Sequence, residues 1–453
     1  WHIAPKPGTD GALAMAMVHT IIEEGLIDKD YVERYTIGAD DLAERAKSRT
    51  PEWAEAICGI RAEDIRKLAR EYATTKSASI RIGVALERHA GGGQTIRAVL
   101  SLPALTGAWR HVGGGILQMT VWEHPYNFEA ICRSDWIPEG TRVVNNLNLG
   151  RLLTGEILLD PPIKSLMCWN SNPATQAPET DKVIKGLKRE DLFLVVAEHF
   201  VSDVAAFADV VLPATMGAEM EDIILAWGHN YLTYNARCAV APGETKSNRE
   251  IFRLLAEKMG YDEQEFKWSD GECLERFIDW NSPVCDGIDL DYLREHGFAR
   301  LVVGDPNDRV PHSEGNFPTP SGKCEIKSSI ASGGNFVAPP FRQMYTAMQD
   351  GSTLDDLPDY TPPRESPSTN SNLAELFPLN ILSPKSHGFL NSCYANMKTK
   401  IDGQGEQFVL INPLDAKSRG IEQDSKVEVF NMRGKFECTA KVTTDVNQGI
   451  VVA

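Results

Sequence analysis

The sequence predicts an α/β protein with parallel sheets, followed by a β-rich, barrel-like domain at its C-terminal end. Short apolar strands alternate with amphipathic helices over more than half of the chain, a rhythm typical of parallel sheets. These strands are continuous apolar runs, as expected where helices cover both faces of a sheet. Near the C-terminal end, apolar residues instead alternate with polar ones, which is the period of a half-buried strand.

The first part of the chain begins with a helix that starts near Gly11 and stops at Gly25, because apolar residues recur there with a helical period. A second amphipathic helix follows Arg61. Residues 79–84 are the first expected strand, and Gly113 to Gly115 end the unit after a further helix. This order predicts an open parallel sheet.

The alternation starts again near residue 160. Residues 165–169, 192–196 and 209–213 are expected strands, separated by one helix with an apolar stripe and one short helix after Ser202. A further helix contains Ile251 and packs after the last strand. We interpret this region as one half of a Rossmann-like nucleotide-binding domain.

Residues 427–431 and 436–442 are expected to pair as a hairpin around Met432 to Gly434. Upstream, the sequence is rich in Asp, Pro and Ser with little periodicity, which is typical of a linker. The predicted organisation is an α/β domain over 1–155, a second α/β domain over 156–350, a linker over 351–372 and the β domain over 373–453.

Composition excludes several classes of protein. The net charge of −17 argues against binding to a nucleic-acid backbone, and no apolar run is long enough for a transmembrane helix. The nine cysteines are dispersed, so no zinc ribbon or iron–sulfur loop is expected, and reduced thiols favour a cytoplasmic over a periplasmic location. The chain starts at Trp1 without a Met or a signal segment, and both ends are interpreted as cuts through a larger protein.

Polar residues gather where the strands of the second α/β region end. In open α/β sheets, ligands bind at the carboxyl ends of the strands, and backbone amides at a helix start suit phosphate. Carboxylates suit ribose hydroxyls or a guanine edge. A nucleotide-like ligand is therefore one interpretation, and simple turn and capping residues are the other. The residues concerned are Asn170, Asn172, Glu198, His199, Ser202 and Asp209.

Six stretches occur together in an order that indicates one family. They are "WHIAPKPGTD", "GLIDKDYVERYTIG", "TPEWAEAICGIRAEDIRKLAREYA", "FADVVLPATMGAEMED", "FPTPSGKCEI" and "VLINPLDAKSRGIEQDSKVEVFNMRGKFECTAKV". In this combination the chain resembles molybdopterin-dependent oxidoreductases of the dimethyl sulfoxide reductase family over essentially its whole length.

This resemblance implies molybdenum or tungsten held by two molybdopterin guanine dinucleotides. Each dinucleotide would lie on one Rossmann-like α/β domain, capped by a six-stranded double-psi-type β-barrel. The implied chemistry is two-electron oxygen-atom or hydride transfer on a small-molecule substrate, as in anaerobic respiration, with an iron–sulfur electron-transfer subunit as partner. A four-iron four-sulfur cluster, where relatives have one, belongs to a segment upstream of the part that matches Trp1.

The resemblance also implies cofactor-binding residues, which divide into three groups. In the first domain, the matching positions are Lys6, Thr9, Asp10, Gly83 and Arg88. In the second domain, around the other dinucleotide, they are Asn170, Asn172, Pro173, Glu198, His199, Ser202, Asp209 and Glu219. In the β domain, they are Ser383, Lys385, His387, Asn391, Ser392 and Asn412. Phe389 departs from the family, since many relatives have a basic residue there.

Simpler roles stay open for several of these residues. The alternative for Thr9 and Asp10 is a helix N-cap alone, and the alternative for Gly83 is sheet packing alone. The substrate cannot be read from the sequence. Candidate residues of a substrate pocket are Trp122, His124, Tyr126 and Trp227, although Trp122 and Tyr126 are equally consistent with core or lid aromatics. Cys58 and Cys168 lie inside apolar runs and are poor candidates for the metal ligand.

In relatives, the protein ligand of the metal (Ser, Cys, selenocysteine or Asp) lies upstream of the part that matches Trp1. We therefore expect that residues 1–453 lack it and are inactive alone. Two alternative functions are a structural homologue without cofactor in a redox complex, and a hydratase or transhydroxylase that uses the same cofactor without net redox chemistry.

Overall fold

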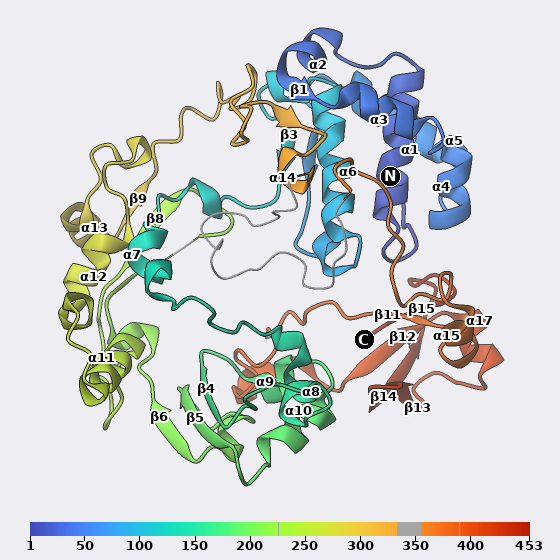
Figure 1. Ribbon diagram of the computed structural model, residues 1–453. Coiled ribbons are helices and arrows are strands. Elements are labelled where there is room, and N and C mark those ends of the chain that lie inside the picture. Colours follow the sequence, from blue (N-terminus) through green and yellow to red (C-terminus); the bar gives the residue numbers. More distant parts are fainter. Residues whose placement is uncertain (225, 333–354, 389) are drawn as a thin grey trace. The chain divides into compact units, whose positions relative to one another are not determined.

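The structure is a computed structural model that describes residues 1–224, 226–332, 355–388 and 390–453 (Figure 1). It contains two compact units, each built from three separate segments. The first unit comprises residues 1–123, 227–230 and 302–378, and the second comprises residues 124–226, 231–301 and 379–453. The domain boundaries expected from the sequence stay a prediction.

Helix α1 (Asp10–Glu23) is the centre of the first unit. It packs against α4 (Pro51–Cys58), α5 (Ala62–Thr74) and α6 (Gly92–Leu105). Because it has neighbours on several sides, α1 is buried around most of its circumference, and its small residues allow close approach. The predicted helices after Gly11 and after Arg61 are thus confirmed.

The strands of the first unit form two short parallel pairs. Strand β2 (Ser79–Arg81) pairs with β3 (Gly115–Leu117), and β1 (Thr36–Ile37) pairs with β10 (Cys324–Glu325). Parallel pairing was expected, but the described residues form separate two-stranded sheets instead of one wide sheet. The expected strand 79–84 stops at Arg81, because the exposed residues after Ile82 turn away toward a 3-10 helix.

The second unit contains the predicted parallel sheet, with β4 (Ser165–Trp169), β5 (Phe193–Glu198) and β6 (Val210–Pro213) in that order. Helix α10 (Thr180–Leu187) makes the crossover between β4 and β5 and packs its apolar side into the same core as the strands. Leu194 and Val196 of the central strand are fully buried there. The carboxyl ends of the three strands therefore meet at one edge.

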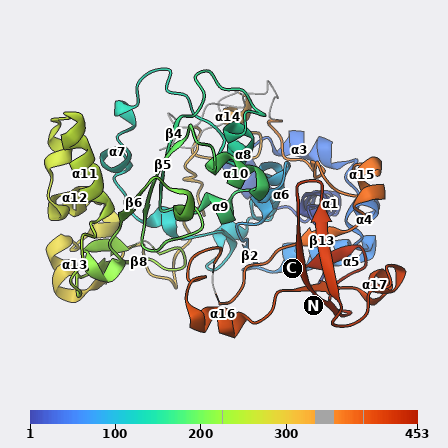
Figure 2. The same ribbon diagram turned by 90° about the horizontal axis from the view of Figure 1, so that it is seen from below.

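An antiparallel sheet of β7 (Asp222–Ile224), β8 (Tyr231–Asn235) and β9 (Phe298–Arg300) follows in the second unit. Helices α11 (Asn248–Met259), α12 (Asp270–Phe277) and α13 (Leu290–His296) form one group in both views (Figures 1 and 2).

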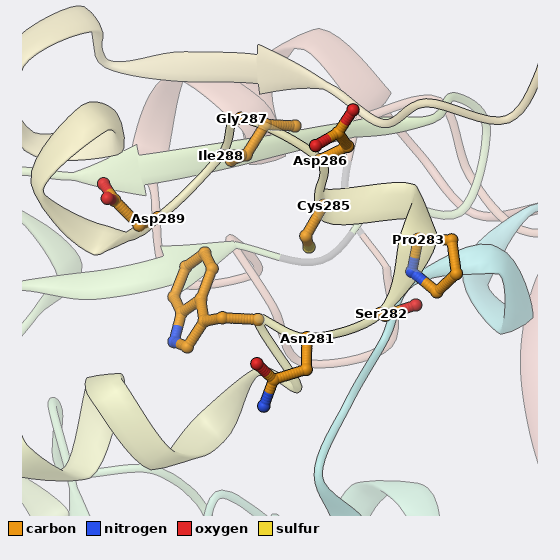
Figure 3. A pocket seen from close by; sticks show the side chains of 9 residues that line it. Asn281, Ser282, Pro283, Cys285, Asp286, Gly287, Ile288 and Asp289 are labelled. Carbon is orange, nitrogen blue, oxygen red and sulfur yellow. The ribbon is translucent and has the colours of Figure 1, made fainter.

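A hollow lies in the loop before α13, lined by residues 280–283 and 285–289 (Figure 3). The Cys285 thiol faces it, and burial raises the pKa of that thiol to about 11, so that it stays protonated. None of the residues expected to bind a cofactor lines this hollow.

The β domain is a curled sheet in the order β11-β15-β12-β14-β13. These strands are Asn380–Leu382, Ile450–Val452, Phe408–Ile411, Gly434–Val442 and Lys426–Asn431. The predicted hairpin is confirmed as β13–β14. The described residues give five strands and a half-barrel, not six, because residues between β11 and β12 form a loop and the helix α16 (Lys398–Gln404).

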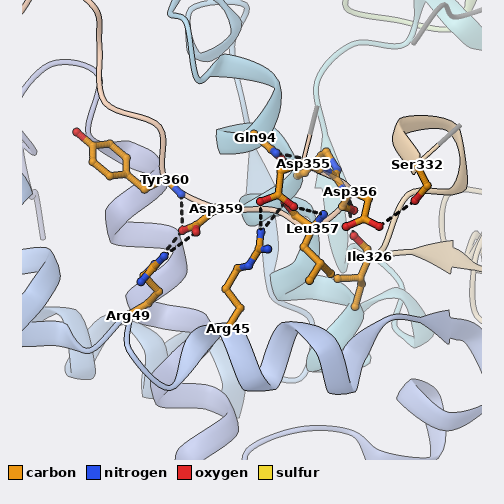
Figure 4. Close-up of polar contacts among 11 residues, drawn as sticks. Arg45, Arg49, Gln94, Ile326, Ser332, Asp355, Asp356, Leu357, Asp359 and Tyr360 are labelled. Atoms are coloured by element: carbon orange, nitrogen blue, oxygen red, sulfur yellow. Dashed lines mark hydrogen bonds and ion pairs between the residues drawn. The ribbon is translucent and has the colours of Figure 1, made fainter. Parts of the chain in front are cut away.

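Part of the predicted linker forms ion pairs with other residues of the first unit. Arg45 pairs with Asp355 at 2.7 Å, and Arg49 donates two hydrogen bonds to Asp359, at 2.9 and 2.7 Å (Figure 4). The Tyr360 ring lies edge-on to Trp53. Acidic residues that are typical of a solvated linker therefore make directed contacts here. Residues 333–354, which include the start of the predicted linker, lie outside the described residues.

No helix in the described part of the chain is both long and apolar enough to cross a membrane.

A carboxylate fixes the start of the crossover helix in the β4–β5–β6 region. Glu179 precedes α10 with a φ of 56°, and its side chain is 7% exposed. Arg151 donates to it from Nε at 2.6 Å and from Nη2 at 3.0 Å, and Lys182 donates at 3.1 Å. The Arg151 hydrogen bonds, helped by Lys182, hold the pKa of Glu179 at about 2, even though burial opposes this.

Replacing this carboxylate, as in Glu179→Gln, is expected to give a pH-dependent loss of stability. An unfolded Glu has a pKa of about 4.3. Because the folded-state pKa of about 2 lies below that value, the contribution of Glu179 is complete above pH 4.3 and is lost as the pH falls toward 2. The free energy of unfolding should drop by about 1–2 kcal/mol at pH 7, and the difference from the parent should shrink below about pH 4 and vanish below about pH 2.

Denaturant unfolding at several pH values measures this difference. Glu156→Gln is the matched control, because Glu156 pairs with Lys182 but is 48% exposed. An equal loss at pH 7 and pH 2.5 would show that the ionised form of Glu179 is not the stabilising one.

Candidate functional site

The carboxyl edge of the β4–β5–β6 sheet carries a set of amide side chains. Asn170 follows β4 with a φ of 52°, a left-handed conformation that Asn tolerates better than most residues. Its Oδ1 accepts a hydrogen bond at 3.1 Å from Nδ2 of Asn248, the first residue of α11. The end of β4 is thus joined to a helix that begins 78 positions further along the chain.

Asn172 joins the ends of two strands. The side chain is 3% exposed; its Nδ2 donates to Asp203 Oδ2 at 3.1 Å, and its Oδ1 accepts from the Val204 amide at 3.1 Å. Pro173 follows at the first position of the short helix α9 (Pro173–Gln176), where a missing amide hydrogen has no cost. Asn172 therefore fixes the loop after β5 from within the protein.

Glu198 and His199 stand at the end of β5. The Nε2 atom of His199 lies 2.9 Å from the carbonyl oxygen of Thr215, which follows β6. Glu198 Oε1 accepts from the His199 amide at 2.7 Å. Both side chains thus lie at the same edge as Asn170, as the sequence predicted.

Two buried polar atoms at this edge have no hydrogen-bond partner within the described part of the chain. They are Oγ of Ser202 and Oδ1 of Asn248. A buried polar atom without a partner costs about 1–3 kcal/mol, so native proteins rarely leave one unless a ligand or water satisfies it. Their position at the carboxyl edge of a parallel sheet is where such folds bind ligands.

Asp209 and Glu219 are not brought to this edge by their side-chain contacts. Asp209 precedes β6 and therefore lies at the amino edge, where its Oδ2 accepts from the Leu194 amide at 2.7 Å. Glu219 Oε2 accepts from the Met216 amide at 2.9 Å and caps a 3-10 helix. Both carboxylates have local structural roles, and their assignment to a cofactor stays a prediction that this geometry does not favour.

The loop after β11 carries most of the expected residues of the β domain. Lys385 Nζ donates to Asn391 Oδ1 at 2.6 Å, and Asn391 has a φ of 52°. Ser392 Oγ accepts from Gln176 Nε2 at 2.9 Å. Ser383 and His387 lie in the same loop, and Phe389 lies outside the described residues.

Asn412 has a clear structural role in the β domain. It is the N-cap of α17 (Pro413–Ser418), and its Nδ2 donates to the Val446 carbonyl at 2.8 Å. A contact of Asn412 with a cofactor stays a prediction.

In the first unit, the residues before α1 form a tight turn. Thr9 is buried, and its Oγ1 donates to the Lys6 carbonyl at 2.6 Å instead of capping the helix. Asp10 is the first helical residue. The N-cap alternative is therefore correct for the position of Thr9, but not for the bond made by its side chain.

The other two expected residues of the first unit follow β2. A Cβ added to Gly83 would meet no described atom within 4 Å, so sheet packing does not account for this glycine. Arg88 Nε donates to the Val84 carbonyl at 2.9 Å, which folds residues 84–88 onto themselves.

Comparison with known proteins shows which family the chain belongs to. Residues 1–258 match the family model described as molybdopterin oxidoreductase, and residues 379–453 match the model described as molydopterin dinucleotide binding domain. The chain belongs to the molybdopterin oxidoreductase family. The predicted resemblance to the dimethyl sulfoxide reductase family is confirmed, and with it a molybdenum or tungsten pterin dinucleotide as the family's cofactor.

Individual relatives match nearly all of this molybdopterin oxidoreductase chain. Probable oxidoreductase YoaE of Bacillus subtilis is 37% identical, covering 100% of the chain and 62% of the relative. Dimethyl sulfoxide reductase DmsA of Escherichia coli is 28% identical, covering 98% and 59%. The F420-dependent formate dehydrogenase subunit alpha of Methanocaldococcus jannaschii is 28% identical, covering 98% and 63%. The chain therefore spans about three fifths of the length of these relatives.

A solved structure shares the fold. Acetylene hydratase from Pelobacter acetylenicus aligns with a TM-score of 0.76 at 23% sequence identity, covering 99% of this chain and 63% of that one. The mixed α/β fold with parallel sheets and a C-terminal half-barrel is thus shared with a protein named as a hydratase, whereas the relatives above are named as an oxidoreductase, a reductase and a dehydrogenase.

The side chains at the sheet edge fit a dinucleotide. Ser202 offers a hydroxyl, Asn170 and Asn248 offer amides, and Glu198 offers a carboxylate, which together match the groups of a sugar phosphate and a guanine base. The two unpaired atoms of Ser202 and Asn248 show that this set is not fully satisfied by the protein itself.

The described residues contain no group of three or more His, Cys, Asp or Glu side chains that could hold a metal ion. Cys58 and Cys168 are buried in the hydrophobic cores of the two units, and burial raises the pKa of Cys168 to about 11. A protonated core thiol is neither a good nucleophile nor a ready metal ligand. These contacts agree with the expectation that neither cysteine binds the metal.

The aromatic residues proposed for a substrate pocket include two core residues. His124 is buried and stacks on Tyr126, with ring centroids 5.7 Å apart, and its Nε2 lies 3.3 Å from the Tyr231 carbonyl oxygen. Tyr126 also packs on Phe128 and Phe277. The core alternative is favoured for these two residues, whereas Trp122 and Trp227 are exposed.

Sequence reasoning missed Asp203, Gln176 and Asn248, which make the contacts that organise the edge. Asn248 follows Ser247, the N-cap of α11; the sequence predicted a helix that contains Ile251, but not the position of its first residue beside Asn170. Asp203 directly follows a predicted site residue. The pairing of these side chains depends on tertiary contacts between residues 31 to 216 positions apart, which leave no local pattern.

Asn172→Leu is expected to loosen the loop after β5. The change removes two hydrogen bonds and leaves the Val204 amide without its partner, which should lower the free energy of unfolding by about 2–4 kcal/mol. Amide hydrogen exchange should accelerate at residues 199–204. Asn307→Leu is the control, because Asn307 is exposed and contacts only Asp305 nearby. Unchanged exchange at 199–204 would show that Asn172 does not hold this loop.

Proposed function

We propose that this chain forms the dinucleotide-binding part of the catalytic subunit of a molybdenum or tungsten enzyme that carries two molybdopterin guanine dinucleotides. The proposed reaction is a two-electron oxygen-atom or hydride transfer on a small substrate. The observation that supports it most directly is the pair of buried, unpaired atoms, Ser202 Oγ and Asn248 Oδ1, at the carboxyl edge of a parallel sheet. Family matches at both ends of the chain support the same cofactor class.

When bound, the metal–pterin group would supply the redox chemistry, and the protein would supply binding and orientation. Ser202, Asn248 and Glu198 would hold one dinucleotide at the sheet edge, and Asn172 would keep the Ser202 loop in place from behind. In the first unit, the open space beside Gly83 would allow close approach of the second dinucleotide. With a net charge of −17, phosphates would be held by these local donors and not by a broad positive field.

A second candidate function is a hydratase or transhydroxylase that uses the same cofactor, which the fold of acetylene hydratase favours. Purified enzyme assayed with artificial electron acceptors and donors separates the two, because only the redox enzyme consumes them. A structural homologue without cofactor is disfavoured, because such a protein would gain stability by filling or pairing the polar positions of Ser202 and Asn248.

Partners are part of the proposal. Relatives are named as a subunit or a chain of a larger enzyme, and we propose an iron–sulfur electron-transfer subunit for this protein as well. The iron–sulfur cluster within the catalytic subunit and the protein ligand of the metal are proposed to lie outside residues 1–453, which would then be inactive alone.

Denaturation of the purified full-length protein is expected to release two guanine nucleotides for each molybdenum or tungsten atom. Chromatography of the nucleotides and mass-spectrometric metal analysis measure this ratio. Ser202→Ala should speed the release of one dinucleotide about five- to tenfold, because it removes one hydrogen bond of about 1 kcal/mol. Ser418→Ala is the control, since Ser418 Oγ donates only to the nearby Asp415 carbonyl. Protein without guanine nucleotide would contradict the proposed function.

A further inference from the structure

One hydrogen bond joins the sheet edge to the β domain of the second unit. Gln176 is the last residue of α9, and its Nε2 donates to Ser392 Oγ at 2.9 Å, although the two residues are 216 positions apart. The other amide atom, Oε1, lies 3.5 Å from the backbone nitrogen of Asn172. The Gln176 amide is thereby held from both of its ends.

This bond belongs to a chain of polar contacts. Ser392 contacts Gln176, Gln176 contacts Asn172, and Asn172 contacts Asp203 and the Val204 amide. Three loops are connected in this way: residues 170–176 after β4, residues 199–204 after β5 and, after β11, the described residues 383–388 and 390–392, which are called the 383–392 loop below. These loops carry most of the residues of the second unit that are expected to contact a dinucleotide; Glu198, Asp209, Glu219 and Asn412 lie outside them.

The β-domain loop is braced internally, so that a single external contact can set its position. Lys385 donates to Asn391 at 2.6 Å, Ser386 donates to Gln404 of α16, and the Gly388 amide donates to Ser386 Oγ at 2.9 Å. Ser392 is the residue of this loop that accepts the hydrogen bond from Gln176.

We propose that Gln176 is a positioning residue that ties the 383–392 loop to the carboxyl edge of the β4–β5–β6 sheet and thereby slows release of the dinucleotide bound at that edge. The inference rests on the proposed function for the identity of the ligand. Gln176 itself need not contact the cofactor, because its amide is engaged by Ser392 and by the turn at Asn172.

A double-mutant cycle on the full-length holoprotein tests this role. Gln176→Leu and Ser392→Ala each break the bond, and the double variant removes both partners. Two rates are measured for each protein: amide hydrogen exchange of residues 383–392 and release of guanine dinucleotide. Each single variant is expected to raise both rates about three- to tenfold, and the double variant no further, because the two residues share one bond.

Two further variants separate positioning from general weakening. Gln176→Glu should behave like the parent, because its carboxylate accepts a hydrogen bond from the Ser392 hydroxyl. Gln404→Leu loosens the same loop through Ser386, so its effect on exchange should add to that of Gln176→Leu. Exchange of the buried strand β5 should be unchanged in all variants, which shows that the sheet stays folded.

Any one of three results would overturn the inference. The effects of Gln176→Leu and Ser392→Ala could be additive, Gln176→Glu could fail to show the parent rates, or Gln176→Leu could show the exchange rates of the parent. These outcomes differ from failure of the proposed function. If the two variants are non-additive in amide hydrogen exchange but the protein releases no guanine nucleotide, the proposed ligand and the effect on its release are refuted. If the protein releases guanine nucleotide but the two variants are additive in exchange, only the link between Gln176 and Ser392 is refuted.

Discussion

The parallel alignment of β4, β5 and β6 is the constraint on which the site depends. Parallel strands bring their carboxyl ends to one edge, so Asn170 and Glu198 lie near each other despite their separation in sequence. The buried Asn172 completes this arrangement, because its amide satisfies Asp203 and the Val204 amide and so fixes the loop that carries Ser202. Without Asn172, the loop after β5 would lose two hydrogen bonds that join it to the loop after β4.

Sequence patterns predicted the elements with strong periodicity or continuous apolar runs. Helices α1 and α5, the three strands of the central sheet and the β13–β14 hairpin all carry signals contained within about fifteen residues. The half-barrel was harder to predict, because its neighbouring strands are not neighbours in sequence and the segment between β11 and β12 has no strand period. The alternating pattern predicted a barrel-like domain, whereas the count of six strands came from the family resemblance and exceeds the five that the described residues form.

The candidate site shows a similar division. The sequence placed Asn170, Glu198 and His199 at a strand end correctly, because each directly follows an apolar run. It placed Asp209 with them, although a residue that precedes a parallel strand lies at the opposite edge. It gave no sign of Gln176 or Asn248, whose partners come from distant segments. Polar residue types near a sheet edge therefore indicate ligand chemistry, but only tertiary contacts show which of them are already engaged by the protein.

The interrupted path of the chain has a consequence for biosynthesis. The first unit uses residues 1–123, but its last segment, 302–378, is complete only when 255 further residues have been added after position 123. At about 5–20 residues per second, this delay is roughly 13–50 seconds. During that interval Arg45 of α3 (Ala39–Ala46) and Arg49, which follows that helix, lack their partners Asp355 and Asp359, while residues of the second unit are being made. These ion pairs of the first unit therefore form only after most of the second unit has been made.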